Sequence, residues 1–196
     1  IAPQEAIDDL GRTGKATANF LRYTLVLKCR EDRSPMNAAL GPIEIDKEEL
    51  VHVHLKTAGR HLLFPHHVGE WRKSVLHVEQ RQAPFISTTG EGAEKVIYLH
   101  QDGGGRGRGI SHPVNQPRTV LSVGNASESQ TVLCAKREME SWGLLQLEPS
   151  ALRELDNINA PFHLDPNGLH LPATLYHLAK CATEVDEKAI YSRVAN

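Results

Sequence analysis

The first part of the chain alternates apolar and polar residues with a period of two. From Leu21 to Cys29 every odd-numbered residue is apolar, while Arg22, Thr24 and Lys28 lie between them. This period predicts a strand that buries one face. Shorter alternations predict further strands at Ile43/Ile45, Val51/Val53/Leu55, Leu62/Phe64, Val75/Val78, 84–88 and 95–100.

The connections between these strands contain residues that favour turns. Gly41-Pro42, Ala58-Gly59 and Pro65 separate the earlier strands, and Thr89-Gly90-Glu91-Gly92 separates the last two. Parallel neighbours need a crossover of about a dozen residues or more, which these short connections do not provide. We therefore expect an antiparallel sheet.

The pattern changes to a helical period near residue 121. Ser127-Glu128-Ser129-Gln130 is typical of a capping box, with Ser127 as the N-cap and Gln130 bonding back to it. Beyond it, apolar residues recur every three or four positions until Gly143, which can end a helix. The expected buried stripe is Val132, Ala135, Met139 and Trp142.

A second helical segment follows a turn. Asp165-Pro166-Asn167-Gly168 has the chemistry of a turn, and Leu171, Leu175, Leu178 and Ala182 then form a helical stripe. Residues 149–155 and the residues after Thr183 predict two shorter helices. Strands first and helices second indicate an α+β fold: an antiparallel β-rich region over 1–120 and a helical region over 121–196.

Composition excludes several classes of protein. The 196-residue chain has 22 Lys and Arg against 24 Asp and Glu, so it carries no global basic field for nucleic acid. No apolar run approaches the roughly 18–20 residues that span a bilayer. The three cysteines, Cys29, Cys134 and Cys181, are too widely spaced for a disulfide framework or a metal-binding pair. We expect a cytoplasmic protein.

The two ends indicate a piece of a longer protein. The sequence starts at Ile1 and stops at Asn196 inside a helical pattern, without a Gly or Pro to end it. We therefore expect the helical region to be truncated.

Several segments carry a resemblance to a known family. Pro117-Arg118-Thr119-Val120-Leu121-Ser122, the run from Arg137 to Trp142, and residues 164–178 (LDPNGLHLPATLYHL) resemble the predicted RecF/SMC-type AAA ATPases of the ABC class. In that family a similar stretch lies between the phosphate-binding loop and the signature and Walker B motifs. The opening, Pro3-Gln4-Glu5-Ala6 and the strand from Phe20, resembles the segment after the Walker A helix; residues 31–100 add almost nothing.

The resemblance implies an ATPase head that uses ATP and Mg²⁺ and pairs with a second head to sandwich the nucleotide. DNA repair and phage defence are both compatible with such an ATPase. It also implies that Gln116 binds the cofactor, because in ABC heads a Gln between the sheet and the helical lobe reaches Mg²⁺ and the attacking water. The alternative, an ordinary loop residue beside Pro117, stays open.

The chain lacks the motifs that would bind ATP by itself. A phosphate-binding loop needs GxxxxGK[ST], whereas Gly14-Lys15 is followed by Ala16, and Asp9 stands where the first Gly should be. Leu121-Ser122-Val123-Gly124-Asn125 is similar to the ABC signature, but the family has its signature after the 164–178 segment. We expect no catalytic residue here and no cofactor bound by this chain alone.

Two further patterns have functional and ordinary interpretations. Gly103-Gly104-Gly105-Arg106-Gly107-Arg108-Gly109 suggests nucleic-acid contacts by Arg106 and Arg108, as in a non-catalytic interaction module, or else a plain surface loop. His52 and His54 share one strand face, as two metal ligands would, or are exposed opposite Val51 and Val53. We expect His52 and His54 to be exposed and to form no metal site.

Overall fold

The computed structural model describes residues 1–30, 41–62, 64, 69–77, 83–102, 109–113, 116, 118–157, 159–181 and 192. The chain forms two compact units, Ile1–Ser141 and Trp142–Asn196. Antiparallel sheets occupy the first two-thirds and helices dominate later, so the predicted α+β class is confirmed.

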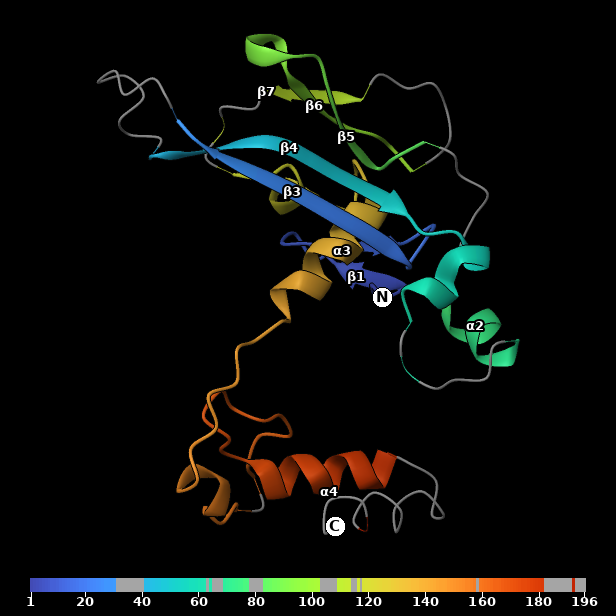
Figure 1. Ribbon diagram of the computed structural model, residues 1–196. Helices are drawn as coiled ribbons and strands as arrows, with labels where there is room; N and C mark the ends of the chain where they lie inside the picture. The colour runs from blue at the N-terminus through green and yellow to red at the C-terminus, as the bar shows by residue number, and fades with distance from the viewer. Residues whose placement is uncertain are drawn as a thin grey trace. The chain divides into compact units, whose positions relative to one another are not determined.

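A five-stranded antiparallel sheet forms the centre of the first unit (Figure 1). Each strand pairs with the next along the chain, as the short connections predicted. The strands are β3 (Leu21–Cys29), β4 (Ile43–His52), β5 (Ile86–Thr89), β6 (Val96–Leu99) and β7 (Ile110–Pro113).

A two-stranded ribbon, β1 (Glu5–Ile7) and β2 (Thr13–Lys15), packs against helix α3 (Gln130–Glu140). Gly14 lies at this contact, where an added Cβ would be only 3.1 Å from Leu133 Cδ2. The absence of a side chain at Gly14 therefore lets the ribbon approach the helix.

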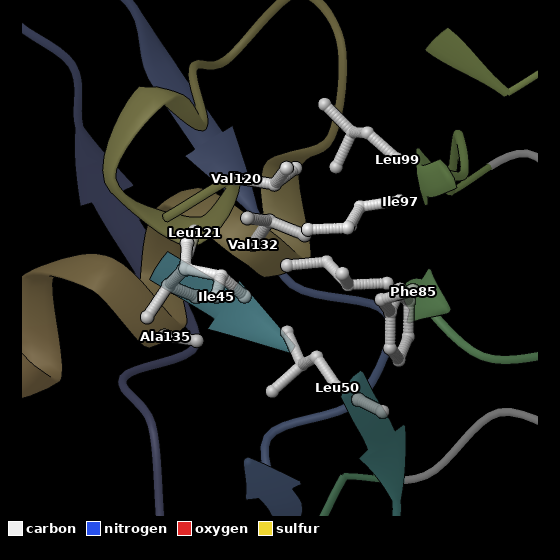
Figure 2. Close-up of a cluster of buried hydrophobic side chains, with 11 residues drawn as sticks. Ile45, Leu50, Phe85, Ile97, Leu99, Val120, Leu121, Val132 and Ala135 are labelled. Atoms are coloured by element: carbon white, nitrogen blue, oxygen red, sulfur yellow. The ribbon is translucent and has the colours of Figure 1, made fainter. Parts of the chain in front are cut away.

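The main core lies where α3 and the segment before it meet the sheet. Figure 2 shows apolar side chains from both sides pointing toward one another. The sheet contributes Ile45, Leu50, Ile97 and Leu99, together with Phe85 directly before β5, and the helical side contributes Val120, Leu121, Val132 and Ala135.

A bulge in β4 reverses the face that the alternation predicted. Val26 pairs with Lys47 but Leu27 pairs with Ile45, so Asp46 is an extra residue in β4. Beyond this bulge Glu48, Leu50 and His52 point into the core. The predicted exposure of His52 is wrong, because its side chain is 9% exposed. His54 is exposed, as expected.

Two predicted strands are helical in part, since Val51 lies in β4 and Val78 lies outside the described residues. Residues from Leu55 onward form a 3₁₀ helix (Leu55–Arg60), and Val75 ends helix α2 (Glu70–Val75). Both pack around a second cluster of buried residues, Phe20, Val53, Ala58, Leu62 and Leu76. The spacing of apolar residues cannot distinguish a short helical segment from a strand. Tertiary packing decides the conformation of both segments.

Helix α3 begins later and ends earlier than the sequence predicted. Ser129, not Ser127, is the N-cap residue, and Gln130 accepts a hydrogen bond from the Lys15 N–H instead of closing a capping box. Val132 is buried and Met139 packs on the core, but Trp142 lies beyond the helix and is 68% exposed. The predicted burial of Trp142 is wrong.

The second unit contains the predicted turn and helix. The Gly168 N–H donates to the Asp165 carbonyl at 2.9 Å, and Gly168 has a φ of 96°, which favours glycine. A 3₁₀ helix (Ala151–Arg153) replaces the short helix expected over 149–155, and α4 (Leu171–Cys181) holds Pro172 in its first turn. In the portion of the chain that the structure describes, no helix is long and apolar enough to cross a membrane.

Candidate functional site

The candidate site is the junction between the five-stranded sheet and α3. Along the chain, Gln116 lies between the end of β7 and the 3₁₀ helix η3 (Leu121–Val123), and its side chain is half-buried. The neighbouring residues 114, 115 and 117 lie outside the described part of the chain.

A buried carboxylate ties this junction to the sheet. Glu48 has no exposed surface, and it accepts the N–H of Val120 on Oε2 and the N–H of Leu121 on Oε1, both at 2.8 Å. The Tyr23 hydroxyl donates to Oε1 at 3.1 Å. Burial, together with the charge of Glu48, raises the pKa of Tyr23. Three donors thus compensate for a charge that would otherwise be costly in the core.

The backbone of Glu48 is fixed as well. Its N–H donates to Thr88 Oγ1 at 2.9 Å, and the Thr88 hydroxyl donates to its carbonyl at 2.8 Å. Glu48 therefore links β4, the neighbouring strand β5 and the start of η3 in one set of hydrogen bonds.

The segment 121–125, which is similar to an ABC signature, leads into a closed turn before α3. Asn125 Oδ1 accepts the N–H groups of Ser127 and Glu128 at 3.0 and 3.1 Å, and its Nδ2 donates to Glu128 Oε2. The Asn125 carbonyl accepts the Ser129 N–H. These polar groups of Asn125 are thus used in hydrogen bonds within the turn.

The chain's own carboxylate occupies the N-terminus of α3. Asp102 Oδ2 accepts the Thr131 N–H at 2.8 Å, and the Ser129 hydroxyl lies 3.5 Å from Oδ1. A bound phosphate at a helix N-terminus would need such first-turn N–H groups. In the described structure this donor is already engaged, so α3 does not present the cradle that a nucleotide requires.

Asp102 is also the last described residue before the Gly-rich segment. Arg106 and Arg108, the predicted nucleic-acid contacts, lie outside the described residues. The structure therefore does not test the prediction that these two arginines contact nucleic acid.

Gly14-Lys15 is part of a strand and not of a phosphate-binding loop. Both residues lie in β2, where Gly14 pairs with Ala6 and Lys15 pairs with Glu5. The Lys15 N–H donates to Gln130 Oε1 at 2.8 Å, and its ammonium lies 3.6 Å from Glu5 Oε1. The backbone donors of this pair are used in packing.

A second acidic group fixes the ribbon to the same junction. Asp8 Oδ1 accepts the N–H groups of Leu10 and Arg12 at 2.9 Å, and Oδ2 accepts the Arg12 guanidinium. Oδ2 also lies 3.3 Å from the Ala126 N. Burial acts to raise the pKa of Asp8, but these donors together lower it to about 2.

The second unit has a polar cluster of its own. His170, with a φ of 66°, places Nδ1 2.7 Å from Asp156 Oδ1, and the other Asp156 oxygen accepts the Ala173 N–H. The His170 contact and the Ala173 N–H hold the pKa of Asp156 below its usual value. This arrangement caps the start of α4.

Within the described residues, the other polar side chains do not gather into a metal site. The His52 and His54 rings lie edge to face at 4.5 Å between centroids. His177 stacks on Phe162, and Cys181 Sγ lies 3.7 Å from its Nε2. Among the residues that the structure describes, no three His, Cys, Asp or Glu side chains are arranged to hold a metal ion.

Comparisons with protein-family models, curated proteins and solved structures gave no match to this chain.

Sequence reasoning missed the residues that organise the junction. Glu48 and Glu49 point to opposite faces of β4, and it is the bulge at Asp46 that turns Glu48 inward. Asp102 precedes a Gly-rich segment and gives no local signal of capping a helix almost thirty residues later. Long-range partners of this kind leave no spacing pattern in the sequence.

Proposed function

We propose that this chain is the middle part of an ATP-hydrolysing head of the RecF/SMC type. The observation that carries the proposal is the ordered resemblance of residues 117–122, 137–142 and 164–178 to that family. The observed order of an antiparallel sheet, a junction with Gln116 and then helices supports it, because the resemblance implies this order.

The residues of this chain do not form a nucleotide cradle on their own. Asp102 occupies the α3 N-terminus, and Gly14-Lys15 is paired within β2. In the proposed head, the phosphate-binding loop and the acidic Walker B residue come from other parts of the longer protein. ATP and Mg²⁺ are then cofactors of the parent protein, which would supply phosphoryl-transfer chemistry driven by positioning and charge.

The contribution of this chain would be structural support and one cofactor-binding side chain, Gln116. Glu48 holds Val120 and Leu121 to the sheet, so the segment that follows Gln116 has a fixed anchor. The proposed partners are the remainder of the head and a second head, with DNA as a further partner, in the cytoplasm.

The coding sequence on both sides of this chain tests the proposal. A GxxxxGK[ST] motif upstream and a signature followed by an acidic Walker B strand downstream are expected. Their absence from the continuous reading frame would reject the ATPase and favour the interaction module.

The protein encoded by the full frame provides the biochemical test. It should hydrolyse ATP with Mg²⁺, and Gln116→Ala should lower kcat with little change in ATP affinity. Gln146→Ala is the matched control, because Gln146 is an exposed residue of the second unit. Equal kcat values for the native protein and Gln116→Ala would remove Gln116 from the proposed site.

A further inference from the structure

Within the described residues, β3 has a long outer edge that no other strand pairs with. β3 is the first strand in the sheet order and spans nine residues. Within the described ranges it pairs on one side only, with β4, and Figure 1 shows it as the end strand of the sheet. An open edge of this kind is a template for pairing with another strand.

The backbone groups on this edge can be identified from the pairing with β4. The Val53 N–H donates to the Phe20 carbonyl, and the Arg30 N–H donates to the Pro42 carbonyl, both at 2.8 Å. Phe20 and Arg30, which flank β3, therefore direct these backbone groups toward the β4 side, and the even-numbered residues between them do the same. Because successive residues of a strand point their N–H and C=O groups to opposite sides, the outer edge is formed by the odd-numbered residues. These are Leu21, Tyr23, Leu25, Leu27 and Cys29.

The side chains of the same five residues form an apolar row. Leu21 and Tyr23 pack on the main core, so the row lies on the core-facing side of the sheet. Further along the strand, Leu25 is 37% exposed and Leu27 is 52% exposed, and Cys29 is exposed as well. The edge thus combines backbone donors and acceptors with uncovered apolar side chains.

We propose that two copies of this chain pair through β3 in antiparallel fashion, about a two-fold axis at Leu25. In this register Leu25 opposes its own copy, Tyr23 opposes Leu27, and Leu21 opposes Cys29. All these residues face the edge, so every opposed pair exchanges both N–H···O bonds. The two sheets join into one, and the contact is the same on both copies.

The side-chain pattern is what favours a second copy as the partner. Alternating N–H and C=O groups are recognised by an extended backbone, and the side chains then select among possible strands. A second β3 matches apolar residues with apolar residues along the whole row. On the opposite face Arg22 opposes Lys28, but Lys28 lies 3.1 Å from the Glu44 carboxylate, which offsets the repulsion.

Sedimentation velocity over a wide concentration range, without nucleotide, tests the proposal. The native chain should show a monomer–dimer equilibrium. Leu25→Lys should raise the dimer Kd by roughly tenfold or more, because it places two ammonium groups opposite each other at the axis. Ile7→Lys is the matched control, since Ile7 is 59% exposed but lies in β1. It should leave the Kd unchanged.

A disulfide test reports on the register and does not depend on a charged substitution. Leu25→Cys is made together with Cys29→Ser and Cys181→Ser. Directly opposed hydrogen-bonded residues have Cα atoms about 5.5 Å apart, which a disulfide can bridge. Oxidation by molecular oxygen should cross-link two copies through position 25, whereas Val26→Cys, which opposes Thr24, should cross-link poorly.

Three results would overturn the proposal: a chain that is monomeric at every concentration, a dimer that Leu25→Lys does not weaken, or equal cross-linking at positions 25 and 26. A chain that stays monomeric would indicate that the β3 edge pairs with a strand of another protein instead. None of these results bears on the proposed ATPase, since the β3 pairing requires no nucleotide.

Discussion

At the scale of single residues, Glu48 is the side chain on which the junction depends most. An apolar residue at this inward position of β4 would be cheaper to bury than a carboxylate. The two N–H groups that it accepts, however, come from the N-cap residue and the first residue of η3, where backbone donors have no partner within the helix. The free-energy cost of burying Glu48 is thus offset by hydrogen bonds that fix the helical side of the core to the sheet.

Replacing this carboxylate should destabilise the protein strongly. Glu48→Ala would leave the Val120 and Leu121 N–H groups buried without their acceptor, each at a cost of about 1–3 kcal/mol. We expect the free energy of unfolding in urea to fall by about 3 kcal/mol or more. Glu48→Gln keeps one acceptor oxygen and should lose less.

Glu49→Ala is the control for this prediction. Glu49 is half-buried on the other face of β4, and its carboxylate lies 3.3 Å from the Lys47 ammonium. A surface pair of this kind contributes about 0–1 kcal/mol. Similar losses for Glu48→Ala and Glu49→Ala would contradict the anchoring role of Glu48.

Asp8 should make stability depend on pH in the acid range. Its pKa is about 2 in the folded chain, against 3.8 for an unperturbed carboxyl, so the folded state binds this proton less readily than the unfolded state. The ionised group therefore stabilises the fold above a pH of about 4, and this contribution is lost as the pH falls through about 2. Asp8→Asn should lower the Tm at neutral pH.

Thermal unfolding followed by circular dichroism at a series of pH values provides the measurement. The Tm difference between the native chain and Asp8→Asn should shrink as the pH falls from about 4 to about 2. Glu5→Gln, an exposed substitution in β1, should leave the Tm profile close to native. A Tm difference that stays constant over this range would rule out a depressed Asp8 pKa as its source.

At the scale of elements, α3 is the helix around which the first unit is built. Val132, Leu133, Cys134 and Ala135 are all buried, since the sheet covers one side of the helix and the β1–β2 ribbon covers another. The segment from η3 to α3 has to pass close to the helix, and Gly124 allows this. An added Cβ at Gly124 would be 2.7 Å from Val132 Cγ1.

Gly124→Ala should therefore lower stability, although Gly124 has an ordinary backbone conformation. Overpacking of a well-packed core costs about 1–3 kcal/mol, and we expect a loss of this size in urea unfolding. Gly69→Ala is the matched control, because no atom of the described residues lies within 4 Å of its added Cβ. Equal effects of the two substitutions would show that contact with Val132 is not the cause.

The elements also show which structural features can be predicted from the sequence pattern. The strand at β3, the turn at Asp165 and the helix at α4 follow directly from local periodicity and turn chemistry, and the structure has all three. The faces of β4 were misassigned because one bulged residue reverses them. The start of α3 was misassigned because the acceptor for its Thr131 N–H is Asp102, which is distant in sequence. Local patterns therefore predict elements, whereas the packed tertiary structure determines their faces and ends.

At the scale of the whole molecule, the two compact units divide the chain after Ser141. The helix α3 belongs to the sheet-containing unit, although the change from strand to helix periodicity begins near residue 121. The candidate junction, from Gln116 to the start of α3, therefore lies entirely within the first unit. Its polar groups are engaged mainly in holding that unit together.

This arrangement leads to the prediction that the chain alone does not bind ATP. A triphosphate needs a set of convergent N–H donors and a lysine. In the described structure the α3 donor at Thr131 is bonded to Asp102, and Lys15 lies in β2. Isothermal titration of the native chain with Mg·ATP should show no heat of binding, with circular dichroism as the check that the sample is folded. Low-micromolar affinity would contradict the prediction. Lys15→Ala would then assign the site: lost binding would indicate Gly14-Lys15, and retained binding would indicate residues 121–125.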